Sequence, residues 1–245
     1  MNKQIILLFL LITIFASCNK DSAKHDNKND TKVVKTDSGS VLNTKNKYFT
    51  DSILLDDNNV PLNKTQNYFP LEIFTDTSVY VGYDTFTVTW YSRHLLAMKE
   101  PLLFNKELNK ELNKEVYRFL WLRTFHNPIT VRIEKSAEDY KLYWKLSDGT
   151  GGYGPGELIV NKMKKLTKRE WDNFQKLLDS AKYWEPETNE KELSGFDGAQ
   201  WILEGVDSKR YNVVDRWSPE SGKFRECCDY LIKLTDLKIN KDDIY

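Results

Sequence analysis

The sequence predicts an α+β fold in which an antiparallel sheet of about five strands is covered by helices on one face. The first observation is that apolar residues alternate with polar ones at the period of two that is typical of strands. The second is that short links join these stretches, which favours antiparallel neighbours. The third is that helical spacing occurs in the segments between and after them. The strand-like stretches are 129–133, 140–146, 158–160, 200–206 and 211–217.

Two helices are expected among these strands. Thr167 and Glu170 have the spacing of a capping box, in which each side chain satisfies a main-chain N–H group at the start of a helix. Apolar residues follow at helical spacing from Trp171 onwards. A last helix is predicted to begin at Ser218-Pro219, because serine is a good N-cap and proline is allowed in the first turn.

The part of the chain before these strands is predicted to be mostly helical and to belong to the same domain. Residues 89–99 read TWYSRHLLAMK, with apolar residues at helical spacing, and Pro101 ends the run. Residues 105–115 repeat the unit Asn-Lys-Glu-Leu almost three times, which places the leucines on one face of a helix. The apolar run 116–125 is expected to continue this helix into the core, with His126 in its last turn.

The first 18 residues resemble the signal peptide of a bacterial lipoprotein. Lys3 supplies a positive charge, and the uncharged apolar run of about 11 residues that follows is too short for a membrane-spanning helix of about 20. The run ends in Ala16-Ser17-Cys18, which resembles a lipobox. This resemblance implies that residues 1–17 are removed and that palmitate or similar acyl chains on Cys18 hold the protein on a membrane. Asn19 is not the aspartate that retains some lipoproteins in the inner membrane, so the outer membrane is expected, with its face left open.

Residues 18–46 are predicted to be a disordered tether that follows the lipidated cysteine. They are polar, lack aromatic residues and mix lysine with aspartate, so they cannot bury enough apolar surface to fold. Residues 47–245 are long enough to form one domain with a substantial core. Within it, residues 47–128 are expected to be irregular and helical, and residues 129–245 to form the sheet and two helices.

Composition excludes several classes of function. The 36 basic and 36 acidic residues balance, so we expect no nucleic-acid partner. The three histidines and three cysteines form no metal-binding or nucleophile motif, so we expect no metal, no cofactor and no recognisable catalytic site. Cys227 and Cys228 are adjacent and are expected to be small core residues, with a redox or metal role left open.

The stretch 148–157 reads DGTGGYGPGE and is rich in glycine. Three of its glycines have the G-x-G-x-x-G spacing of a dinucleotide-binding loop. Such a loop requires a helix directly after it, whereas another strand is predicted here. The glycines are therefore expected to allow positive φ angles in a wide hairpin, and Asp148 and Tyr153 are the candidate ligand contacts within it.

Three carboxylates are weak catalytic candidates. Asp197 lies at a predicted turn, and Glu204 and Asp215 lie on paired strands. If Glu204 and Asp215 project to one face, they could act as acid and base toward a glycosidic bond. The alternative is that each is solvated or forms a salt bridge with Arg210 or Arg216.

Four arginines are weak candidates for ligand binding. Arg118, Arg123 and Arg132 are predicted near a buried junction, and Arg216 lies on the hairpin that carries the carboxylates. A guanidinium group in apolar surroundings needs an acceptor, which is either a protein carboxylate or an anionic ligand.

Three segments resemble parts of a group of exported bacterial proteins of unknown activity. The segments are EVYRFLWLRTFHNPITVRIE (115–134), DGTGGYGPGEL (148–158) and DGAQWILEGVDSKRYNVVDRWSP (197–219). The resemblance covers most of residues 90–235 and implies the extent of the domain, but it implies no catalytic residue.

The sequence as a whole predicts a lipid-anchored protein of the cell envelope that acts by binding a protein or glycan partner. The alternatives are a glycan-directed hydrolase that uses the carboxylates, and an immunity or inhibitor protein. The chain has seven tryptophans, which could stack on sugars, but five of them fit element faces that a core would use, namely Trp90, Trp121, Trp144, Trp171 and Trp201.

Overall fold

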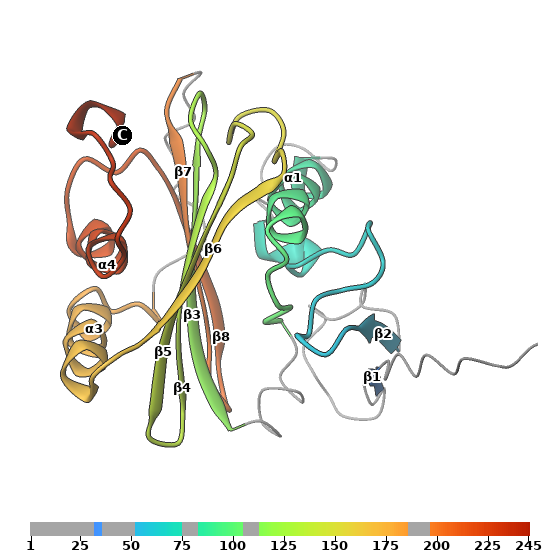
Figure 1. Cartoon of the computed structure of the whole chain (residues 1–245), viewed down its shortest axis with the longest axis horizontal. Coiled ribbons are helices and arrows are strands. Elements are labelled where there is room, and N and C mark those ends of the chain that lie inside the picture. The colour runs from blue at the N-terminus through green and yellow to red at the C-terminus, as the bar shows by residue number, and fades with distance from the viewer. Residues whose placement is uncertain (1–31, 36–51, 75–82, 105–112, 186–196) are drawn as a thin grey trace, which may run out of the picture.

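The centre of the molecule is an open, antiparallel sheet of six strands, in a mixed α+β fold (Figure 1). The computed structural model describes residues 32–35, 52–74, 83–104, 113–185 and 197–245. The strand order across the sheet is β6-β5-β4-β3-β7-β8. The strands are β3 (Lys114–Arg123), β4 (Ile129–Ser136), β5 (Asp139–Ser147), β6 (Leu158–Lys165), β7 (Ala199–Val206) and β8 (Tyr211–Trp217). The five predicted strands are confirmed as β4 to β8.

The strand at the centre of the sheet, β3, corrects the prediction of a helix through residues 116–125. β3 pairs with β4 on one side and β7 on the other. Tyr117 and Phe119 point to one face, Arg118 and Leu120 point to the other, and all four are buried. Because both faces of β3 are covered, apolar residues occupy nearly every position, and the period of two that identifies a half-exposed strand is absent.

Helices lie on both faces of the sheet, whereas the sequence predicted a cover on one face. In Figure 1 the sheet is seen nearly edge-on, with α3 (Lys168–Ser180) and α4 (Lys223–Lys233) on its left. On the right lie α1 (Tyr83–Ala97) and the short 3-10 helix η2 (Leu71–Phe74). α1 confirms the helix predicted within residues 89–99. It covers the second face of the sheet, a position that the sequence did not indicate.

The face under α3 and α4 is a predominantly apolar core. The predicted capping box is present, because Thr167 N–H donates to Glu170 Oε2 at 2.7 Å and Glu170 N–H donates to Thr167 Oγ1 at 3.2 Å. Trp171 and Phe174 of α3 pack against Tyr117 of β3, with ring centroids 6.2 and 5.4 Å from it. Of the five tryptophans predicted to be in the core, four are buried, and they are Trp121, Trp144, Trp171 and Trp201. The fifth, Trp90, is only half-buried.

The two adjacent cysteines belong to the same core. Cys227 and Cys228 are free thiols, and both are fully buried in α4. Burial raises the pKa of the Cys227 thiol to about 12. The prediction of small core residues is confirmed, and a thiol in this state is a poor nucleophile.

Two local predictions near helix ends are wrong. The last helix does not start at Ser218-Pro219 but at Lys223, after the N-cap Gly222, whose φ is 107°. Ser218 Oγ instead accepts the N–H of Ala199 at 2.8 Å, which fastens the end of β8 to the start of β7. His126 follows β3 in a turn and does not end a helix. Residues 105–112 of the predicted repeat helix at 105–115 lie outside the described residues, whereas Lys114 and Glu115 belong to β3 and not to a helix.

A short two-stranded sheet lies beyond α1. It consists of β1 (Lys32–Lys35) and β2 (Ser52–Leu55), which pair antiparallel. β1 falls inside the segment 18–46 predicted to be a tether, so four residues of that segment form a strand. The rest of that segment, together with the predicted signal peptide and Cys18, lies outside the described residues. In the part of the chain that is described, no helix has the length and apolar character that crossing a membrane requires.

Candidate functional site

A groove of about 580 Å³ lies between α1 and the hairpin that joins β5 to β6. We call it the α1–hairpin groove. Figure 1 shows the hairpin, residues 148–157, reaching toward α1 at the upper end of the sheet. The groove is lined by Thr85, Phe86, Thr89, Trp90 and Arg93 of α1 and by Gly152 and Tyr153 of the hairpin.

The helix that forms one wall of the groove is apolar on two sides. Val88, Tyr91 and Leu95 of α1 are buried against the sheet and η2. On the groove side, Phe86 is 66% exposed and Trp90 is half-buried. A helix on a protein surface usually turns polar residues to solvent, so the outward aromatic side of α1 is a departure from the normal pattern.

The glycine-rich hairpin forms the other wall, and it is held in place by the turn after β3. Gly151 N–H donates to His126 O at 3.0 Å, and Gly152 N–H donates to Thr124 O at 3.2 Å. A Cβ atom on Gly151 would lie 2.6 Å from main-chain atoms of Arg123, so only glycine permits this approach. The predicted hairpin is confirmed, and its glycines serve mainly close packing.

Positive φ explains only one glycine of this hairpin. Gly156 has a φ of 64°, and it is the position at which a left-handed conformation is required. Asp148 closes the base of the hairpin, because its Oδ1 accepts the N–H of Glu157 at 2.7 Å. Of the two candidate contacts in this stretch, Asp148 therefore has a structural partner, whereas Tyr153 lines the groove.

Aromatic rings lie on both walls of the groove. The Phe86 and Trp90 rings are neighbours on α1, with centroids 6.2 Å apart. On the hairpin side, Tyr153 is 67% exposed and lies beside Phe125, with centroids 6.4 Å apart. Trp90 Nε1 donates to Gly151 O at 3.0 Å, and this hydrogen bond joins the two walls.

A neutral histidine lies next to this junction. His94 is fully buried one turn after Trp90, with the two ring centroids 6.4 Å apart. Within the described residues, neither ring nitrogen of His94 makes a hydrogen bond of normal geometry. Burial, with a smaller contribution from the charge of Arg93, lowers the pKa of His94 to about 4. The ring is therefore uncharged at neutral pH, as its surroundings require.

Several of the predicted arginine and carboxylate candidates meet in a buried charge cluster on the α1 face of the sheet. Arg118 forms a salt bridge with Glu204 and lies 3.7 Å from Glu100. Arg132 Nε donates to Glu100 Oε2 at 2.9 Å, and Lys145 Nζ lies 3.0 Å from Glu100 Oε1. Glu100 thus joins cations from three strands, and it was not among the residues that the sequence singled out.

The electrostatics of the cluster are those of a closed ionic network. Burial alone would raise the pKa of Glu100, but Arg132, Lys145 and Arg118 outweigh it and hold this pKa at about 2. Burial raises the pKa of Glu204, although Arg118 and the Tyr211 hydroxyl, 2.9 Å away, both stabilise the carboxylate. Glu204 is only 1% exposed, so its carboxylate oxygens face protein groups and not solvent.

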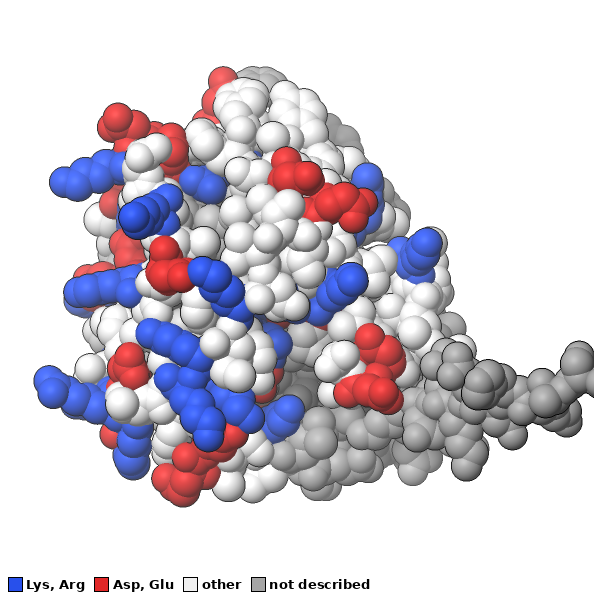
Figure 2. Space-filling view, viewed as in Figure 1, with Lys and Arg blue, Asp and Glu red and all other residues white. Residues whose placement is uncertain are grey.

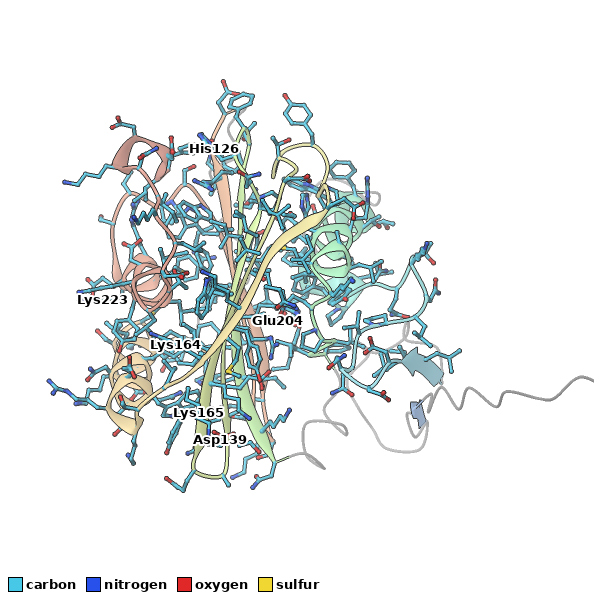
Figure 3. All side chains as sticks on the ribbon, in the orientation of Figure 1. His126, Asp139, Lys164, Lys165, Glu204 and Lys223 are labelled. Atoms are coloured by element: carbon cyan, nitrogen blue, oxygen red, sulfur yellow. The ribbon has the colours of Figure 1, made fainter. Side chains whose placement is uncertain are left out.

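The carboxylate candidates do not form an accessible acid–base pair. Glu204 and Asp215 share the α1 face, as the register of β7 and β8 requires. Both are buried, and Tyr91 Oη donates to Asp215 Oδ2 at 2.8 Å. Figure 3 shows Glu204 near the middle of the sheet on its α1 side. Asp197 is exposed in the turn before β7, and none of the three lines the α1–hairpin groove.

Two arginine candidates lie on the opposite face, so the predicted set of four is divided. The Arg123 guanidinium packs 4.4 Å from the Trp121 ring and donates to Asp243 O and Asn127 O, each at 3.2 Å. Arg216 lies over the Phe224 ring, 5.8 Å from its centroid.

The C-terminal residues complete the packing near Arg123. His126 contacts the Tyr245 hydroxyl through Nδ1 at 2.8 Å and Asp243 through Nε2 at 3.2 Å. Tyr245 O accepts from Trp201 Nε1 at 2.9 Å. These contacts fasten the C-terminus to the upper end of the sheet, where Figure 3 labels His126.

The surface over β6 and α3 is rich in lysine, but its charge is largely balanced. Figure 2 shows basic side chains gathered on this part of the molecule with acidic ones among them. Lys162 lies 2.5 Å from Asp236, and Lys168 lies 2.7 Å from Asp172. Such exposed pairs are expected on a solvated surface and do not by themselves indicate an anionic partner.

Comparison with known proteins assigns the chain to no family. No protein-family model matches it, and no curated protein is significantly similar to it. The likeness of three segments to exported bacterial proteins therefore stays a prediction, and the function has to be inferred from the site.

Proposed function

We propose that the protein is a lipid-anchored binding module of the cell envelope that holds its ligand in the α1–hairpin groove. The observation that supports this most is that Phe86 and Tyr153 leave two-thirds of their surface exposed on opposite walls of one groove. Exposed apolar groups rimmed by polar ones mark interaction sites, and the volume of the groove falls in the usual range for ligand sites.

The hydrolase alternative has less support. The carboxylate of Glu204 is occupied by Arg118 and Tyr211. A catalytic carboxylate has to come within hydrogen-bond reach of its substrate. An exposed aromatic groove can bind a ligand without a catalytic carboxylate.

The proposed anchor rests on the N-terminal sequence. Two or three acyl chains on Cys18 would hold the domain stably on a bilayer, since each buried methylene contributes about 0.8 kcal/mol. We expect metabolic labelling with a palmitate analogue to mark the wild-type chain, which should partition into detergent. The Cys18→Ser variant should lose both properties, whereas Cys228→Ala, which removes a buried thiol, should keep them. A Cys18→Ser variant that still entered the detergent phase would contradict lipidation.

Binding is tested with the chain that lacks the signal peptide and lipid, residues 19–245, which contains every described residue. Its retention by isolated envelopes of the producing cells is measured for wild type, Phe86→Ser and Tyr153→Ser. Each groove variant should weaken retention by about tenfold, the effect of losing one stacked ring. Met163→Ser removes an exposed apolar side chain on β6, away from the groove, and should change nothing. Equal retention of all four proteins would refute the proposed site.

A further inference from the structure

We infer that the ligand of the α1–hairpin groove is an acidic saccharide, a glycan whose pyranose rings carry carboxylate groups. This inference rests on the proposed function and specifies the chemical class that the groove accepts. It follows from the order of side chains along α1, from the charge of the groove and from the rigidity of its walls.

The first argument is the chemistry of the lining. A pyranose ring has faces made of C–H groups and a rim of hydroxyl groups, so it needs apolar and hydrogen-bonding partners close together. Along the groove side of α1, Thr85 precedes Phe86 and Thr89 precedes Trp90, and both threonines are exposed. Each aromatic ring therefore has a neighbouring hydroxyl that can donate and accept. Tyr153 offers a third ring from the opposite wall.

The second argument is charge. Among the described residues that line the groove, Arg93 is the only one with an ionic side chain, and it is exposed. Aromatic rings alone would also suit a cationic ligand, but a guanidinium at the same site repels one. An arginine fork matches the geometry of a carboxylate, to which it can donate two parallel hydrogen bonds. The groove is thus complementary to an anionic ligand and not to a cationic one.

The third argument is that the walls are positioned before any ligand binds. The hairpin is fastened to the turn after β3 by two main-chain hydrogen bonds and to Trp90 by a third. Glycine at 151 permits this close contact, and it sets Tyr153 opposite the rings of α1. A rigid site of this kind loses little conformational entropy when it binds a stiff ring.

The test compares a saccharide with and without its charge. Residues 19–245 are titrated with trigalacturonate and with its methyl ester, which has the same rings but no carboxylate, and the binding constants are measured by calorimetry. Trimannuronate and adenosine monophosphate serve as a second acidic sugar and as a non-saccharide anion with a stacking group. We expect an acidic trisaccharide to bind about fivefold more tightly than the methyl ester, as one exposed charge pair allows.

The variants separate the two contributions. Arg93→Met removes the guanidinium group, keeps an unbranched side chain and should abolish the preference for the acid over the ester. Phe86→Ser and Tyr153→Ser should weaken the acid and the ester equally, by about tenfold. Met163→Ser should alter neither.

Three outcomes would overturn the inference. They are a preference for the acid that survives in Arg93→Met, tighter binding of adenosine monophosphate than of either sugar, and no binding of either acidic sugar at millimolar concentration. If envelope retention still depends on Phe86 and Tyr153 in that last case, the ligand class is wrong but the binding function stands. If retention is also independent of them, both proposals fail.

Discussion

On the side of α3 and α4, the sheet meets its helices mainly through aromatic and aliphatic side chains, whereas on the side of α1 the same strands also carry a cluster of buried ions. Tyr117 and Phe119 of β3 belong to the first face, and Arg118, between them, belongs to the second. An apolar face is stabilised by burial and tolerates exchange of similar side chains. A face with paired charges admits far fewer arrangements, because each ion needs its own partner.

The difference has a structural consequence for the groove. Glu100 lies three residues after the end of α1, and its contacts with Arg132 and Lys145 attach this end of the helix to β4 and β5. Arg118 adds a hydrogen bond of 2.7 Å to Pro101 O. The charge cluster therefore holds in place the helix that forms one wall of the α1–hairpin groove.

The largest expected effect comes from breaking the ionic face at its centre. Glu100→Gln removes the carboxylate that three cations share, and we expect the free energy of unfolding to fall by about 3–5 kcal/mol, measured by urea denaturation at neutral pH. Glu138→Gln, at an exposed turn, should change it by less than about 0.5 kcal/mol. Adding Lys145→Met to Glu100→Gln should recover part of the loss, because one uncompensated charge is removed. A loss below about 1 kcal/mol for Glu100→Gln would show that the two faces do not differ as described.

A large-to-small substitution on the apolar face should lower the free energy of unfolding as any cavity in a hydrophobic core does. Leu178→Ala in α3 deletes a buried side chain, and we expect a loss of about 3 kcal/mol in the free energy of unfolding. Because no ion contacts this position, the loss should be the same at neutral and at mildly acidic pH. A loss that grew as the pH fell would mean that α3 is coupled to the charge cluster through the sheet.

The smallest expected effect is a pH dependence of the free energy of unfolding that comes from His94 of α1. The folded protein keeps His94 neutral down to about pH 4, whereas the unfolded chain binds a proton near pH 6.5. Lowering the pH through this interval therefore favours unfolding, by up to about 3 kcal/mol, and below pH 4 the contribution no longer grows.

The measurement is the free energy of unfolding as a function of pH. His94→Leu should lose the part of the slope between about pH 6.5 and about pH 4 that wild type shows. Met98→Leu, a buried and non-titrating change one residue after the end of α1, should retain it. Identical slopes for all three proteins would mean that His94 is accessible to protons in the folded state.

Local patterns in the sequence predicted those elements whose identity depends on neighbours along the chain. The period of two predicted β4 to β8, because most of these strands keep some polar positions next to apolar ones. The capping box predicted the start of α3, since Thr167 and Glu170 need only each other. The glycine-rich stretch predicted a hairpin for the same reason: the strands on either side of it were already recognisable.

The sequence identified several charged candidate residues, but it did not predict which partners they have or what they do. Arg118 and Arg132 were expected to need acceptors, and they have them, but the acceptor that they share is Glu100, a residue with no distinguishing pattern around it. Phe86 and Arg93 were not predicted as site residues at all, because α1 is apolar on several sides and its sequence does not show which side meets the sheet. Only Tyr153 was a candidate from sequence that the structure places in the groove.

The sequence alone therefore determined the strands that alternate, the helix that begins with a capping box and the glycine hairpin, because these follow from contacts within a few residues. Tertiary structure decided that β3 is a strand, since apolar residues occupy most of its positions on both sides only because layers cover both of its faces. Tertiary structure also decided the charge pairs and the groove. Arg118 and Glu204 are 86 positions apart, and Trp90 and Gly151 are 61 apart, so no local pattern in the chain could join them.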